Sequence, residues 1–113
     1  MIKDHEGVKN AIRNIVAMIR LKNFNELVSK GFASVLEAQD IRDAVTTYGR
    51  TIIDLPDQAF DRAYEYDLGG HLFQTEIQFY TEDEGESDLT LICEISLTDK
   101  DNFLIKSVKA HVL

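Results

Sequence analysis

Five acidic side chains crowd into seven positions in the second half of the chain: Glu82, Asp83, Glu84, Glu86 and Asp88. Gly85 interrupts the run, and strand-like alternation flanks it, so we expect a turn between two strands. The spacing does not fit a calcium-binding EF-hand loop. A run of this kind is commonly just a solvated turn. Acids without a nearby base also repel one another, so a partner rich in Lys and Arg would relieve that repulsion.

Further carboxylates fall on the strands themselves. Alternation predicts that Glu65 and Asp67 point outward on one strand, and that Glu76 and Tyr80 point outward on the next. Carboxylates accept bidentate Arg, and Tyr is a common interface anchor, so this face could contact a protein. A plain solvated sheet face is the alternative. The predicted partner-binding residues are Glu65, Asp67, Glu76, Tyr80, Glu82, Asp83, Glu84, Glu86 and Asp88.

Side chains for metal binding or nucleophilic catalysis are scattered. His5, His71 and His111 lie far apart in the sequence, and no pair has ligand spacing, so we expect neither a metal site nor a cofactor. Cys93 falls on the apolar side of a predicted strand, where a thiol is inert. A serine elbow and a glycine-rich phosphate loop are both absent. The residues themselves therefore show no recognisable catalytic motif.

The first half of the chain reads as three helices. The first has an apolar stripe from Val8 to Ile19 and Asp4 as its expected N-cap. Asn23 and Ser34 each stand three residues before a Glu, the spacing of a capping box. Gly31 and Gly49 follow the last periodic residues of the second and third helices and are expected to end them.

The second half reads as an antiparallel meander. Gly69-Gly70 predicts a hairpin turn, which would place Tyr64 and Tyr66 on the buried face. We expect a bulge near Lys106-Ser107, where alternation slips. The segment from Ile52 to Phe60 is expected to be an edge connection followed by one helical turn. The four predicted strands cover residues 64–68, 72–80, 89–97 and 103–112.

These elements predict a two-layer α+β fold, in which about three N-terminal helices pack on one face of a C-terminal antiparallel β-meander of about four strands. We expect a single domain over residues 1–113, with a helical layer at 1–50 and an acidic sheet at 51–113.

The charge is divided between the same two parts. The 113 residues carry a net charge of -8, yet residues 1–53 have eight basic and six acidic side chains. Residues 54–99 have thirteen acids and one base, Arg62. This balance argues against nucleic acid or a membrane surface as the partner. The charged N-terminus lacks the apolar stretch of a signal peptide, so we expect a cytoplasmic protein.

The layout and some short phrases resemble a known group of proteins. The phrases are LPDQAF at residues 55–60 and the stretch from Ser87 to Leu113, including SDLTLICEISLTDKDNF and the closing AHVL. They are similar to small bacterial immunity domains of polymorphic and contact-dependent toxin systems. The resemblance implies a non-enzymatic cytoplasmic protein that binds and neutralises one cognate toxin domain. Many such toxins are nucleases, which must be basic to hold phosphates, and an acidic inhibitor would suit them.

Two other classes of function remain open. Helices on a curved antiparallel sheet are similar to cystatin-like and nuclear-transport-factor-like cones, which enclose a pocket for a small molecule or an active site. Tyr48, Asp61, Tyr64 and Tyr66 could then line a cavity, with one carboxylate as a base. The third class is a structural or regulatory module that dimerises through its sheet.

Overall fold

The first helix, α1 (Glu6–Arg20), is held by its apolar stripe, since Val8, Ile15 and the other stripe residues are buried. In the computed structural model, which describes residues 4–99 and 102–113, its N-cap is His5 and not the expected Asp4. The His5 Nδ1 accepts a hydrogen bond from the Val8 amide at 3.1 Å. The same ring packs edge-on against Phe103, with 5.5 Å between ring centroids, so it joins the helix to the sheet.

The next two helices, α2 (Phe24–Ser29) and α3 (Val35–Tyr48), lie where the sequence predicts them. Ser34 and Glu37 form the expected capping box. The box expected at Asn23 is wrong, because that side chain makes no cap hydrogen bond. The backbone N–H of Asn23 instead donates to the Met18 carbonyl at 2.8 Å and closes the end of α1. Gly49 ends α3 with a φ of 73°.

One antiparallel sheet holds all the strands, and β3 is at its centre. The order is β1-β3-β4-β5, and β2 pairs with β3 beside β1. The short strand β1 confirms the expected edge segment, and α4 confirms the helical turn after Pro56. The bounds of these elements are β1 (Ile52–Ile53), α4 (Gln58–Asp61), β2 (Tyr64–Gly69), β3 (Leu72–Thr81), β4 (Gly85–Leu97) and β5 (Phe103–Val112).

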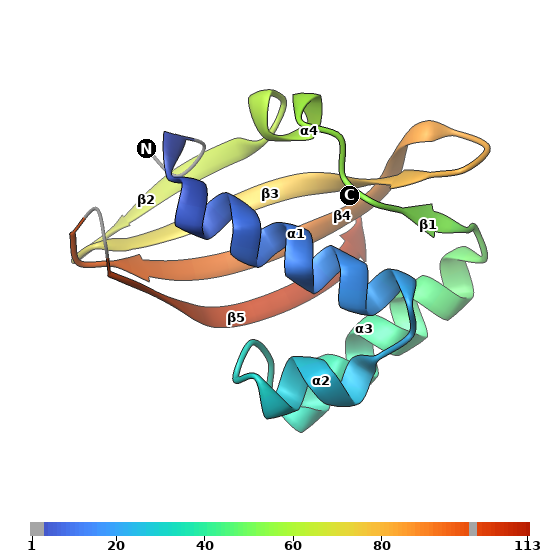
Figure 1. Ribbon diagram of the computed structural model, residues 1–113, viewed down its shortest axis with the longest axis horizontal. Helices are drawn as coiled ribbons and strands as arrows, with labels where there is room; N and C mark the ends of the chain where they lie inside the picture. The colour runs from blue at the N-terminus through green and yellow to red at the C-terminus, as the bar shows by residue number, and fades with distance from the viewer. Residues whose placement is uncertain (1–3, 100–101) are drawn as a thin grey trace.

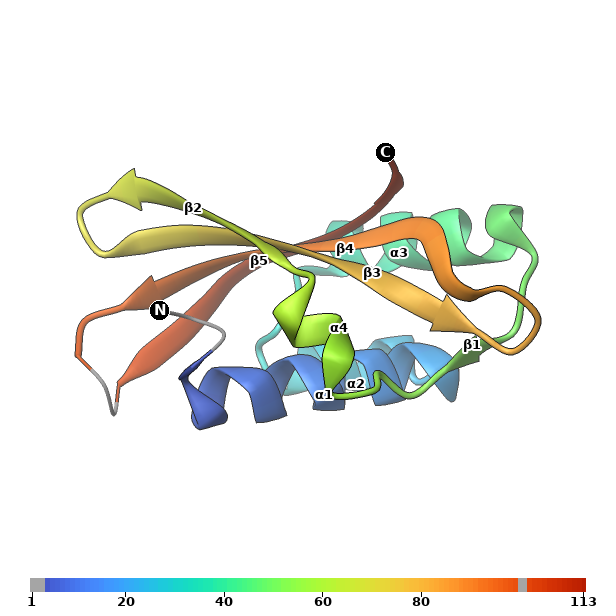
Figure 2. The same ribbon diagram turned by 90° about the horizontal axis from the view of Figure 1, so that it is seen from above.

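The helices and the sheet form two layers around a shared apolar core. Helices α1, α2 and α4 lie on one side of the sheet, while α3 runs along β5 (Figures 1 and 2). In the part of the chain that the structure describes, no helix lies over the opposite face of β2 and β3 (Figure 2). We call that uncovered side the outer face. The core joins helix residues such as Ile12 and Ile41 to sheet residues such as Phe79 and Leu91, as the α+β prediction requires.

The β2–β3 hairpin corrects the predicted side-chain directions. The tight turn is formed by Gly70 and His71, both with positive φ, and a bulge shifts the pairing between Asp67 and Gly69. A shift of one residue moves every side chain of a strand to the other face. Tyr64 and Tyr66 therefore lie on the outer face, opposite Glu76 and Gln74, and the prediction that they are buried is wrong.

The same shift turns Glu65 and Asp67 toward the other side of the sheet. Glu65 lies opposite Thr75, which pairs in turn with the buried Cys93. Asp67 occupies the equivalent position opposite Phe73. The prediction that Glu65 and Asp67 share the outward face with Glu76 is therefore wrong.

Tyr80 is buried, with only 6 % of its surface exposed, so the prediction of an outward anchor is also wrong. It pairs with Ile53 of β1 on one side and with Glu86 of β4 on the other. The β3–β4 pairing shifts between Gln78 and Tyr80, where residues 87–89 of β4 stand opposite the single residue Phe79 of β3, so β4 bulges beside the end of β3. The expected bulge in β5 is confirmed, since Glu94 pairs with Ser107 and Ile95 with Ile105.

Candidate functional site

The outer face carries two rows of side chains that run across the sheet. Residues directly opposite in antiparallel strands project to the same side, so the strand register defines each row. The first row is Tyr64, Glu76, Ile92 and Lys109. The second row is Tyr66, Gln74, Glu94 and Ser107. Two tyrosines at the β2 side and two carboxylates in the middle thus form one continuous surface.

Glu76 is at the centre of the polar contacts on this face. Its Oε1 accepts from the Tyr66 hydroxyl and its Oε2 from the Gln74 amide, each at 3.4 Å. The charge of Glu76 and partial desolvation raise the pKa of Tyr66, which stays a neutral donor. Tyr64 is 68 % and Tyr66 45 % exposed. Exposed rings beside carboxylates can contact the apolar stem and the charged head of an Arg or Lys.

Most acidic side chains of the turn have ion-pair or hydrogen-bond partners, contrary to what the sequence suggests. Asp83 pairs with Arg50 at 2.6 Å, and Glu86 holds Arg62 through both carboxylate oxygens. Glu84 accepts hydrogen bonds from the Tyr48 hydroxyl at 3.0 Å and the Thr81 hydroxyl at 2.9 Å. Three of the five acids thus have partners, which corrects the expectation of an uncompensated run.

The other two acids, Glu82 and Asp88, are exposed, and their side chains make no hydrogen bond or ion pair with the described residues. Their backbone amides are held, by the Thr51 carbonyl and the Tyr48 hydroxyl respectively. The turn is therefore a fixed loop with two free carboxylates. Of the nine predicted partner-binding residues, Glu76 belongs to the two rows of the outer face, and Tyr80 is buried.

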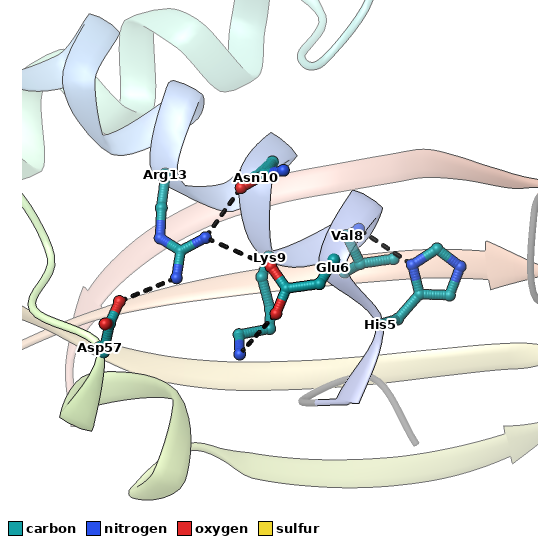
Figure 3. Close-up of polar contacts among 7 residues, drawn as sticks. All are labelled: His5, Glu6, Val8, Lys9, Asn10, Arg13 and Asp57. Carbon is teal, nitrogen blue, oxygen red and sulfur yellow. Dashed lines mark hydrogen bonds and ion pairs between the residues drawn. The ribbon is translucent and has the colours of Figure 1, made fainter.

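A cluster of polar contacts in the N-terminal half of the chain is centred on Arg13. Arg13 of α1 pairs with Asp57 at 3.0 Å and also contacts Asn10 and Glu6 (Figure 3). Its guanidinium lies over the Phe60 ring, 4.9 Å from the centroid. These contacts fasten α4 to α1, so Arg13 has a structural role.

Reactive and metal-binding groups do not converge in residues 4–99 and 102–113. No three His, Cys, Asp or Glu there come together as metal ligands. Burial raises the pKa of the Cys93 thiol to about 12, as expected for an inert core cysteine. Tyr64 and Tyr66 cannot line a pocket beneath the helices, because they lie on the outer face. No helix in these residues is long and apolar enough to cross a membrane.

A groove at the ends of the helices was not anticipated from the sequence. It lies between the end of α1, the start of α2, the second half of α3 and β1, with a volume of about 1270 Å³. Four basic residues line it: Arg20, Lys22, Arg42 and Arg50. They come from separate elements, so the only advance signal is the excess of basic over acidic residues in residues 1–53.

These features define a small two-layer α+β protein with an exposed tyrosine- and carboxylate-bearing sheet face. The chain belongs to the family described as "Domain of unknown function (DUF7668)", which matches residues 16–113. No curated protein and no solved structure matches the chain.

Proposed function

We propose that the chain is a non-enzymatic cytoplasmic binding protein of the immunity type, which neutralises a basic partner domain by covering it with the outer face of β2–β4. The observation that carries the proposal is the uncovered sheet face, where Tyr64 and Tyr66 stand beside Glu76 and Glu94. Aromatic anchors next to carboxylates are the chemistry that recognises Arg and Lys on a protein surface.

The acidic turn has a secondary role in this proposal. Its paired acids would each have to leave Arg50 or Arg62 before they could bind a partner, which lowers their net contribution. The free carboxylates of Glu82 and Asp88 and the net charge of residues 54–99 would instead steer a basic partner toward the face. Steering changes the association rate and its salt dependence more than the final affinity.

The test begins with the protein encoded beside this chain in its source genome. That neighbour is expressed in a bacterial host with and without the chain, and growth and complex formation are measured. We expect the neighbour to be toxic alone, and the chain to restore growth by binding it. A neighbour that is harmless, or that stays toxic without binding the chain, would contradict the proposal.

Two charge-reversal variants then locate the interface. Glu76→Lys with Glu94→Lys should weaken binding by about tenfold or more, because both side chains lie inside the contact. Glu82→Lys with Asp88→Lys makes the same change in charge on the turn and serves as the matched control. It should slow association and leave the dissociation rate nearly unchanged. If only the control variant lost protection, the turn and not the face would be the binding surface.

A further inference from the structure

The groove at the helix ends is a candidate binding site separate from the outer face. Its floor is apolar, since Ile19 and Ile52 are almost fully buried and Phe24 and Val45 are partly buried. Its walls are polar and come from α1, α2, α3 and the segment around β1. An apolar floor with a few polar groups above it is typical of sites for small ligands.

Four of the twelve basic residues of this acidic chain line the groove. Arg20 uses its Nε to bind Asp54 at 3.0 Å, and Arg50 uses one Nη to bind Asp83. Each guanidinium has other N–H groups, and a planar fork can hold a second oxyanion beside the first. The side chains of Lys22 and Arg42 make no hydrogen bond or ion pair with residues that the structure describes.

Lys22 adopts a backbone conformation that a lysine adopts rarely. Its φ is 61°, in the left-handed region where Gly is preferred, at the position that ends α1. A Gly there would relieve the strain, so the Lys side chain is present at the expense of stability. Strained residues of this kind occur at functional sites more often than elsewhere. The backbone of Lys22 thus gives an observation that is independent of the charge of the groove.

We infer that this groove binds a small organic anion with at least two oxyanion groups, carboxylate or phosphate. Lys22 and Arg42 hold one group from opposite walls, and the free N–H groups of Arg20 and Arg50 hold the other. The apolar part of the ligand lies on Phe24, Val45 and Ile53, which line the groove and are accessible. Cations from the end of α1 and from the stretch between Arg42 and Arg50 favour two anionic groups over one.

A long polyanion does not fit the same surface. Glu26, Asp54 and Glu82 also line the groove, and Asp83 stands next to it on Arg50. These acids, and the net charge of -8, repel a chain of phosphates that extends past the groove. The ligand is therefore compact.

The test is a titration of the ¹⁵N-labelled protein with citrate and, separately, with inorganic pyrophosphate, at constant ionic strength. The first probe carries carboxylates and the second phosphates, so the two arms distinguish the sources of the anion. We expect saturable shifts with at least one probe, confined to the backbone amides of residues 19–26 and 49–54. Absence of saturation with both probes, or shifts spread over the whole chain, would overturn the inference.

Variants separate binding from folding. Lys22→Gly should weaken binding about tenfold and raise the thermal unfolding midpoint, because it removes a cation and the backbone strain together. Arg42→Gln, which changes an exposed helix position, should weaken binding to a similar degree. Lys30→Gln, an equal loss of charge outside the groove, is the control and should bind as the parent does. If Lys30→Gln weakened binding as much as Lys22→Gly, the effect would be general charge and the site would be refuted.

Discussion

The acidic turn and the outer sheet face are both rich in carboxylates, yet their surroundings differ. In the turn, Asp83, Glu84 and Glu86 are held by Arg50, Tyr48 and Arg62, which come from other parts of the chain. On the face, Glu76 accepts from neutral Tyr66 and Gln74, and no ion pair with a described residue neutralises its charge. The density of acids along a sequence is therefore a poor guide to free charge, because the compensating groups come from distant residues.

The largest expected effect concerns the thiol beneath the face. With its pKa raised from 9.0 to about 12, Cys93 has a thiolate fraction about a thousandfold below that of an ordinary thiol at pH 8. We expect no measurable reaction with a disulfide reagent in the native protein and prompt reaction after unfolding. Fast labelling of the native protein would mean that β4 opens, and that the face is not a fixed surface.

A pair of tyrosine truncations tests the corrected directions. Tyr80→Ala should lower the free energy of unfolding by about 3 kcal/mol, because it leaves a cavity in the core. Tyr66→Ala, on the exposed face, should leave the denaturation midpoint nearly unchanged. Urea titration of both variants measures this. Equal losses of unfolding free energy would show that the two rings have similar surroundings. The distinction between the buried end of β3 and the exposed face would then be wrong.

Glu37 is a third kind of carboxylate, one that fastens a helix to the sheet. Burial would raise its pKa, but hydrogen bonds from the Ser34 amide, the Ser107 hydroxyl and the Val108 amide hold it below the ordinary value. Because the pKa is depressed in the folded state, this stabilisation is present above the unfolded pKa and is lost as pH falls through the folded one. Glu37→Gln should reduce the loss of stability between pH 6 and pH 3 in urea titrations, by less than about 1 kcal/mol. An unchanged pH profile would contradict this.

The smallest effect comes from the ion pairs of the turn. Arg50→Gln should destabilise by about 0.5 kcal/mol in low salt and by less in high salt, since the pair with Asp83 is half-exposed. Glu82→Gln removes a neighbouring acid that has no side-chain partner among the described residues, and should be neutral or slightly stabilising. Thermal unfolding at two salt concentrations compares them. If both variants changed the unfolding midpoint equally at both salt concentrations, paired and unpaired acids of the turn would contribute equally to stability.

The helical half of the fold could be predicted with few errors because its signals are local. The apolar stripe of α1, the Ser34–Glu37 box and Gly49 each act within one or two turns of helix. The sheet was predicted less well, since one bulge near Gly69 reversed the directions of β2. Side-chain direction in a strand depends on counting residues, so one extra residue changes the result for the whole strand.

The candidate site depends on contacts that have no local signal. The partners of the turn acids, Arg50 and Arg62, lie 33 and 24 residues away from Asp83 and Glu86. The four cations of the groove come from two segments, the end of α1 with Lys22 and the stretch from Arg42 to Arg50, which meet in the folded chain. Sequence could indicate that acids and bases are unevenly distributed, but not which of them remain free after folding.

The side-chain directions of β2 also bear on whether two copies of the molecule can associate through their sheet edges. Its outer edge has no hydrogen-bonded strand beside it among the described residues, and an open edge invites strand addition and aggregation. The register puts Glu65 and Asp67 on the core-facing side of this edge, and Asp67 also accepts from the Gly69 amide at 2.8 Å. A strand docking there would bring the same two carboxylates from each copy into an interface. A bulge and inward-facing carboxylates at an open edge are features with which natural sheets discourage strand addition.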